Sequence, residues 1–165
     1  MSLFEPVFVA LNAVEARYVV VGGLATVLHG YARLTADIDM IVDLDPPELE
    51  KTLEAMSALG LRPRAPVDPL AFADAEVRRN WIEEKGMTVF SFWDPQVPMR
   101  EVDLFVEHPI PFAELWQRSE LVHLDVTAVR IASISDLIAL KRLAGRPEDL
   151  QDIEALEAIA LQRPK

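Results

Sequence analysis

"VVVGGLATVLHGYARLTADIDMIV", residues 19–42, joins two apolar segments through a glycine pair and ends with two aspartates one residue apart. The β-branched run that begins at residue 18 and leads into the glycines at 22 and 23 predicts a buried strand. Residues 24–30 carry apolar side chains at helical spacing and end on a glycine, which predicts a short helix. Residues 37–42 return to strand character. The stretch therefore predicts a strand, a tight turn, a helix and a second strand that carries both aspartates.

Composition narrows the class of protein. The chain has 165 residues, of which 51% are hydrophobic, so it can bury one sizeable core and we expect a single domain over 1–165. It contains no cysteine, which excludes a disulfide framework, a zinc–thiolate site and a thiol nucleophile. The formal net charge of −11 argues against a broad electrostatic grip on nucleic acid. The apolar runs are too short to span a membrane, and the first residues carry Glu5 without a basic leader, so we expect a cytoplasmic protein.

Helical and extended patterns alternate along the rest of the chain. Two apolar segments that are separated by a turn-rich stretch predict a hairpin. The alternation predicts an α/β (α+β) fold with a mixed central sheet flanked by helices. The further predicted elements are helices at about 4–16, 45–60 and 70–85, a proline-rich loop at 62–69, hairpin strands at 87–93 and 101–107, one or two short strands within 121–132, and a C-terminal helix pair at about 135–144 and 148–161.

The paired aspartates carry the first chemical signal. In a strand Asp37 and Asp39 point to the same face, about 6.6 Å apart along the chain. Arg33 and Thr35 join that face if the extended backbone begins earlier. Neighbouring carboxylates repel each other, and divalent cations with a preference for hard oxygen ligands relieve that repulsion. An isolated Asp-x-Asp is more often a solvated strand edge or turn, so the pair alone does not indicate a metal site.

Two further features are consistent with a site. Gly22 and Gly23 lie where a strand gives way to a helix, and such a turn can present backbone N–H groups to phosphates. A tight turn without a ligand is the alternative. Asp103 stands between apolar residues in a predicted strand, where it is either an exposed-face residue or a third carboxylate of the site.

The order of these features carries a family resemblance. A glycine pair, then Asp37-x-Asp39, then Asp103 resembles the active-site pattern of the DNA polymerase beta-like nucleotidyltransferase superfamily. Within it, "VVGGLATVLHGYARLTADIDMIV" together with "SDLIALKRLAGRPEDLQDIEAL" at 135–156 is similar to small bacterial proteins related to the AbiEii-type toxin nucleotidyltransferases. The resemblance implies the nucleotidyltransferase fold.

The resemblance also implies roles for single residues. Asp37, Asp39 and Asp103 would hold Mg²⁺ or Mn²⁺, and Asp103 would act as general base on an acceptor hydroxyl. Gly22 and Gly23 would cradle the phosphates of a nucleoside triphosphate. The reaction would transfer a nucleoside monophosphate and release pyrophosphate, which needs charge neutralisation and alignment more than covalent help.

The two stretches that carry the resemblance also contain charged candidate residues. Arg33 and Lys141 are the predicted phosphate-binding cations. The alternative for Lys141, which lies on or beside the apolar stripe of its helix, is that its stem covers the edge of the core. Asp149 and Asp152 are three residues apart and neighbours on the last helix. Capping or pairing with Arg146 or Lys141 and a catalytic role both stay open for these two aspartates.

Two functions remain from the sequence. The favoured one is a metal-dependent nucleotidyltransferase that uses ATP, GTP or another nucleoside triphosphate to modify an RNA end, a protein hydroxyl or a small molecule. The resemblance extends it to a toxin–antitoxin system with an antitoxin as partner protein. The alternative is a non-catalytic module of the same fold that binds a nucleotide or a partner.

Overall fold

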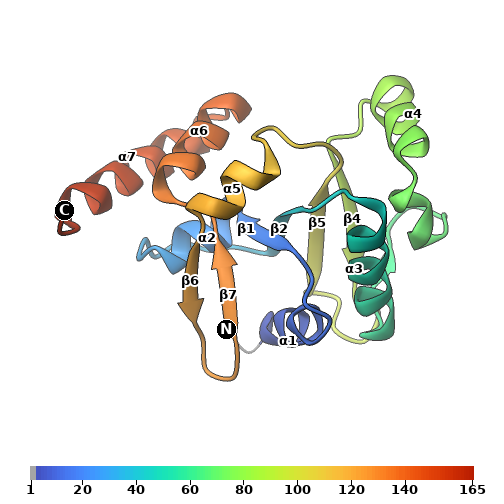
Figure 1. Cartoon of the computed structure of the whole chain (residues 1–165). Coiled ribbons are helices and arrows are strands. Elements are labelled where there is room, and N and C mark those ends of the chain that lie inside the picture. Colours follow the sequence, from blue (N-terminus) through green and yellow to red (C-terminus); the bar gives the residue numbers. More distant parts are fainter. Residues whose placement is uncertain (1–2) are drawn as a thin grey trace.

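The computed structural model describes residues 3–165, which form one mixed sheet with helices packed around it (Figure 1). The strands are β1 (Tyr18–Val21), β2 (Asp37–Val42), β3 (Arg62–Pro63), β4 (Val89–Trp93), β5 (Glu101–Phe105), β6 (Glu120–His123) and β7 (Ala128–Ile131). Across the described residues these seven strands follow the order β3-β4-β5-β2-β1-β7-β6. The mixed sheet confirms the predicted fold class.

The helices connect the strands and cover the sheet. They are α1 (Glu5–Ala13), α2 (Gly22–Leu28), α3 (Pro46–Ala58), the short 3₁₀ helix η1 (Pro69–Ala73), α4 (Ala75–Lys85), α5 (Phe112–Arg118), α6 (Ile134–Ala144) and α7 (Pro147–Gln162).

The centre of the sheet is built from β5, β2 and β1. Strand β2 runs antiparallel to β1 and parallel to β5. Along β2 the side chains alternate as predicted: Ile38 and Met40 are fully buried in the core, while Asp37 and Asp39 are half-buried on the other face. This alternation leaves one polar face at the middle of an apolar sheet.

The predicted helix at 70–85 is divided in two by Asp74. Its backbone is extended, and its carboxylate accepts hydrogen bonds from the N–H groups of Glu76 and Val77. These bonds satisfy two free donors of the following helix, so Asp74 starts α4 and separates it from η1. At its other end, α4 stops on Gly86, which has a left-handed backbone with φ of +60°.

Three other details differ from the prediction. The proline-rich segment 62–69 is not entirely loop, because β3 pairs with the end of β4. Helix α5 was not predicted, since Pro109 and Pro111 precede it closely and obscure its short apolar pattern. The extended strand does not begin early, so Arg33 and Thr35 lie in the loop before β2 rather than on its face.

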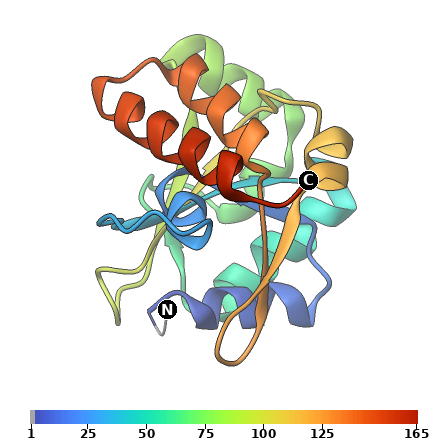
Figure 2. The same ribbon diagram turned by 90° about the vertical axis from the view of Figure 1, so that its left-hand side faces the viewer.

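The predicted C-terminal helix pair is present. Helices α6 and α7 lie side by side, and α6 also contacts α2 beside the glycine turn (Figure 2). Gly145, with φ of +64°, ends α6, and Pro147 begins α7. Among residues 3–165, no helix combines the length and the hydrophobicity that crossing a lipid bilayer would require.

Candidate active site

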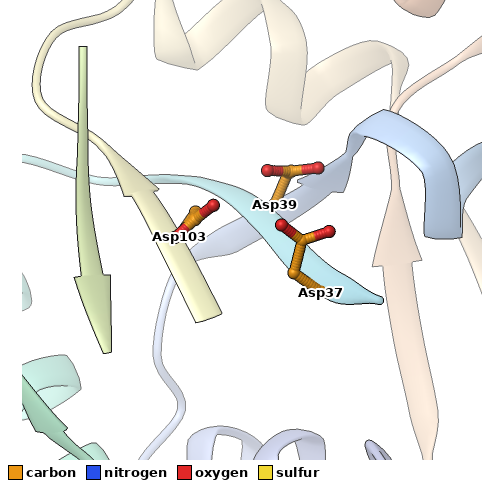
Figure 3. A group of neighbouring side chains, drawn as sticks. All are labelled: Asp37, Asp39 and Asp103. Carbon is orange, nitrogen blue, oxygen red and sulfur yellow. The ribbon is translucent and has the colours of Figure 1, made fainter. Parts of the chain in front are cut away.

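Strand register brings the three predicted carboxylates together. In the parallel ladder between β2 and β5, Asp39 is paired with Asp103, and Asp37 lies two residues before Asp39 on the same face. Figure 3 shows Asp37 and Asp39 on β2 and Asp103 on the adjacent strand β5. One carboxylate oxygen from each residue lies within 4.8 Å of the other two. Oxygen atoms at this spacing suit a shared divalent cation.

The electrostatics of the cluster also fit a cation. The Oδ1 atom of Asp103 is buried and has no hydrogen-bond partner within residues 3–165. Burial, together with the charges of Asp37 and Asp103, raises the pKa of Asp39 to about 7. Burial is also the largest cause of the raised pKa of Asp103, and it outweighs the lowering effect of the Ser91 hydroxyl. A divalent cation supplies the positive charge that these crowded carboxylates lack.

The glycine turn packs directly against this cluster. Val21, the last residue of β1, is paired with Asp39, and Gly22 follows with φ of +67°. A Cβ atom on Gly22 would overlap Oδ2 of Asp39. A Cβ atom on Gly23 would lie 3.0 Å from the Thr35 hydroxyl. Both positions are therefore restricted by close approach of neighbouring chain segments, whether or not the turn also binds phosphate.

Three basic side chains line the cavity that contains the carboxylate cluster: Lys141 and Arg146 from the region of α6 and α7, and Arg33 from the loop before β2. Lys141 is buried, and its Nζ donates to Asp152 at 2.8 Å and lies 3.8 Å from Asp149. The guanidinium of Arg33, on the loop before β2, also donates to Asp152. Arg146 donates to Asp149 at 3.0 Å. The two buried aspartates therefore hold three cations at one side of the site.

These contacts distinguish the two aspartates. Burial by itself would raise the pKa of Asp149, but the hydrogen bonds and charge of Arg146, with the charge of Lys141, lower it overall. Asp149 also accepts the backbone N–H of Arg146 at 3.2 Å, as expected for a carboxylate in the first turn of α7. The capping and pairing roles predicted as one option are present for Asp149, and pairing with Lys141 is present for Asp152.

One cavity of about 940 Å³ joins these groups. Its charged end contains both glycines, the three carboxylates and the cations Arg33, Lys141 and Arg146. Its other walls are apolar and come from β4, β5 and α6. The cavity is thus continuous from the carboxylate cluster to an apolar region.

The sequence match identifies the family. Residues 5–161 match a family model described as a nucleotidyltransferase of unknown function (DUF6036). The protein belongs to this nucleotidyltransferase family. No curated protein matches the chain.

Solved structures share the fold of this nucleotidyltransferase. The lincosamide antibiotic adenylyltransferase LnuA, with lincomycin bound, has a TM-score of 0.63 at 14% identity over 96% of this chain and 97% of its own. ANT(2″)-Ia in complex with adenylyl-2″-tobramycin has a TM-score of 0.59 at 14% identity over 97% and 92% of the two chains. At these identities the match concerns the fold. The nucleotidyltransferase resemblance stated from the sequence is confirmed by the family match.

The nucleotidyltransferase also has cavity residues that the sequence analysis did not assign to the site. Arg146 was predicted only as an ion-pair partner, yet it lines the cavity, and its charge partly opposes the rise in the pKa of Asp39. Phe105 follows Asp103 by two residues and faces the same cavity. Strand alternation could have placed Phe105 there. Leu140 of α6 also lines the cavity, but its position there depends on how α6 packs, which the sequence does not define.

Proposed function

We propose that this nucleotidyltransferase is metal-dependent and moves a nucleoside monophosphate from a nucleoside triphosphate to a hydroxyl of a small molecule. The observation that carries the proposal is the cluster of Asp37, Asp39 and Asp103, with one oxygen of each within 4.8 Å of the others. Mg²⁺ or Mn²⁺ held there would neutralise triphosphate charge and align the reacting groups.

The residues of the chain have separate tasks in this proposal. Asp37 and Asp39 hold the cations. The backbone N–H groups at Gly22 and Gly23 cradle the phosphates, while Arg33 and Lys141 offset the phosphate charge. Asp149 and Asp152 position the basic side chains of Arg33, Lys141 and Arg146 and do not touch the substrate.

Asp103 serves as the general base. The acceptor hydroxyl gives its proton to Asp103 as its oxygen forms a bond to the α-phosphorus. The bond between that phosphorus and the oxygen bridging to the β-phosphate breaks, and pyrophosphate leaves. The register of the β2–β5 ladder places Asp103 opposite Asp39, so its carboxylate lies beside the metal site where the acceptor hydroxyl would react.

The choice of a small molecule as acceptor is supported by charge and by the structural neighbours. A net charge of −11 disfavours a polyanion such as RNA. LnuA and ANT(2″)-Ia, by their descriptions, are associated with lincomycin and adenylyl-2″-tobramycin, which are small molecules. A toxin–antitoxin role would be the cellular function of this activity. In that case, expression of the protein arrests growth, and co-expression of a neighbouring gene restores it.

The first test is thermal melting with each of the four ribonucleoside triphosphates, with and without Mg²⁺ or Mn²⁺. Ligand that binds the folded state stabilises it by roughly 2.7 kcal/mol at a hundredfold excess over its dissociation constant. We expect a metal-dependent rise in wild type that the variant Asp37→Asn/Asp39→Asn loses. The matched control is Asp43→Asn/Asp45→Asn, a second Asp-x-Asp pair just beyond the other end of β2, which should keep the rise.

Pyrophosphate release measures the chemistry separately. Asp103→Asn should still bind nucleotide with metal but lose pyrophosphate release in the presence of an acceptor. Full release by Asp103→Asn would contradict the assigned base. Metal-dependent nucleotide binding without release for any acceptor would favour the non-catalytic module.

A further inference from the structure

The proposed function gives no task to the apolar part of the cavity. It is formed by side chains of two strands, one helix and the loops beside them. Its main apolar lining residues are Val89, Phe105, Pro109, Leu137, Leu140 and Leu143.

This apolar wall begins beside the proposed base. Phe105 lies two residues after Asp103 on β5, so both side chains point to the same face of the sheet. Val89 is paired with Phe105 across the β4–β5 ladder, as Ser91 is paired with Asp103. The floor of the cavity therefore changes from a carboxylate to apolar groups within one step along the strands.

Helix α6 repeats the same change on the facing wall. Leu137, Leu140, Lys141 and Ala144 all line the cavity, and their spacing of three, four and seven residues places them on one side of the helix. Lys141 supplies the charged part of this side, and its neighbours are apolar. A bound molecule would thus meet charge at one end and apolar groups at the other.

The rim of the cavity exposes large apolar side chains to solvent. Leu34 is 96% exposed, Met99 75% and Leu143 70%. All three line the same cavity, although they come from the loop before β2, the β4–β5 connection and α6. Exposed apolar side chains that gather around a site favour ligands able to cover them, because burial of apolar surface stabilises the complex.

We infer that the apolar wall is the acceptor subsite and that the acceptor is an amphiphilic hydroxyl compound without negative charge. Its hydroxyl lies beside Asp103 and its apolar part lies against Phe105, Leu140 and the rim. This inference rests on the proposed function and names the substrate class of the same site. The apolar wall carries no basic side chain, so it offers nothing to pair with an anionic acceptor.

The test compares probes that differ in one property. Methyl β-D-glucoside and n-octyl β-D-glucoside offer the same ring hydroxyls, and the second adds an alkyl chain. Calorimetry measures their binding, with the octyl compound kept below its micelle-forming concentration, to protein loaded with Mg²⁺ and a non-hydrolysable triphosphate analogue. A 12-nucleotide RNA with a free 3′ hydroxyl is the third probe. We expect the octyl compound to bind at least tenfold tighter than the methyl compound, and tighter than the RNA.

Rim variants place the binding in this cavity. Leu34→Ser and Leu143→Ser each change a solvent-exposed side chain, so the fold should persist, and each should weaken octyl glucoside binding at least threefold. Leu161→Ser is the matched control, because Leu161 is 88% exposed and does not line the cavity. It should leave the binding unchanged.

Contrary outcomes are distinct from failure of the proposed function. Equal affinity for the two glucosides, or tighter binding of the RNA, overturns the apolar subsite. Rim variants that weaken the triphosphate analogue instead of the glucoside assign the wall to the nucleobase and also overturn it. Calorimetry needs no turnover, so a protein that binds octyl glucoside as expected but never releases pyrophosphate contradicts the proposed function alone.

Discussion

Gly22 meets two separate requirements at one position. Its φ of +67° is costly for a residue with a side chain, and a Cβ atom there would collide with Oδ2 of Asp39. We expect Gly22→Ala to destabilise the protein by about 1–2 kcal/mol through its backbone and to abolish the metal-dependent melting shift by displacing Asp39. Gly86→Ala is the control, because Gly86 has φ of +60° and open space around it.

The Gly86→Ala control separates the effect of backbone strain from the effect of displacing Asp39. Gly86→Ala should lose similar stability in urea unfolding yet keep the melting shift with Mg²⁺ and triphosphate. A Gly22→Ala protein that kept its full melting shift would show that the carboxylate of Asp39 does not depend on the missing side chain.

Asp39 links the site to the pH dependence of stability. Its folded-state pKa of about 7 is above its ordinary value of 3.8. Between about pH 4 and 7 the folded protein therefore keeps a proton on Asp39 that the unfolded chain has already released. Without metal, this group therefore lowers stability as pH rises through that window. Asp39→Asn should be more stable than wild type at pH 8 by at least about 1 kcal/mol, since one pKa unit corresponds to about 1.4 kcal/mol.

Urea unfolding in the presence of a chelator at pH 5 and pH 8 measures this effect. At pH 5 the wild type carries a protonated Asp39, so the two proteins should be closer in stability than at pH 8. Asp125→Asn, on the exposed turn between β6 and β7, controls for removal of one acid from a protein of net charge −11. An Asp39→Asn variant that was less stable than wild type at pH 8 would contradict the crowded, buried carboxylate.

At the scale of elements, Asp152 connects α7 with two other segments. It accepts hydrogen bonds from Lys141 of α6 and from Arg33 of the loop before β2. Asp152→Asn leaves the buried Lys141 ammonium without its closest charged partner, so we expect a loss of about 3 kcal/mol in urea unfolding. Glu157→Gln should cost less than about 0.5 kcal/mol, because its pair with Arg142 joins the same two helices but is exposed.

Stability and binding need not change together in this variant. If Asp152 positions Lys141 and Arg33 for phosphate, Asp152→Asn should also weaken triphosphate binding, measured well below its melting temperature. A variant that lost stability and kept its full nucleotide affinity would assign Asp152 to the helix packing alone.

In the molecule as a whole, Arg163 forms hydrogen bonds to residues far away in the sequence. Arg163, just after α7, donates to Glu120 of β6 at 2.9 Å and to Nδ1 of His29 at 2.8 Å. The other ring nitrogen of His29 contacts the Ala132 carbonyl, which can only accept, so that nitrogen carries the proton and His29 is neutral. Burial, and to a lesser degree the charge of Arg163, lowers the pKa of His29.

This arrangement gives a pH-dependent cost for losing Arg163. Because the folded-state pKa of His29 is lowered, stability falls as pH drops from about 6.5 through the lower folded-state value, and protonated His29 can no longer accept from Arg163. Arg163→Ala should cost about 1 kcal/mol at pH 8 and less at pH 5, measured by urea unfolding. The exposed Arg142→Ala is the control and should show no such difference between the two pH values.

Features that depend only on neighbours along the chain could be predicted from the sequence. Alternation put Asp37 and Asp39 on one face of β2, and turn and cap residues placed the ends of α6 and α7, whereas α2 (Gly22–Leu28) lies two residues earlier than the predicted helix at 24–30. The same local signals failed where a cap divided one helical pattern at Asp74 and where prolines obscured α5. The order of glycines and aspartates was enough to indicate the nucleotidyltransferase class.

Contacts between distant residues could not be predicted from the sequence in this way. The parallel register that pairs Asp39 with Asp103, the close approach of Asp39 to Gly22 and the sharing of Asp152 by Arg33 and Lys141 each join separate segments of the chain. The apolar wall beside Asp103 likewise needs α6 packed across the sheet. Local preferences set the conformation of each segment, but contacts between segments depend on the packing of the whole core, which no single stretch of sequence encodes.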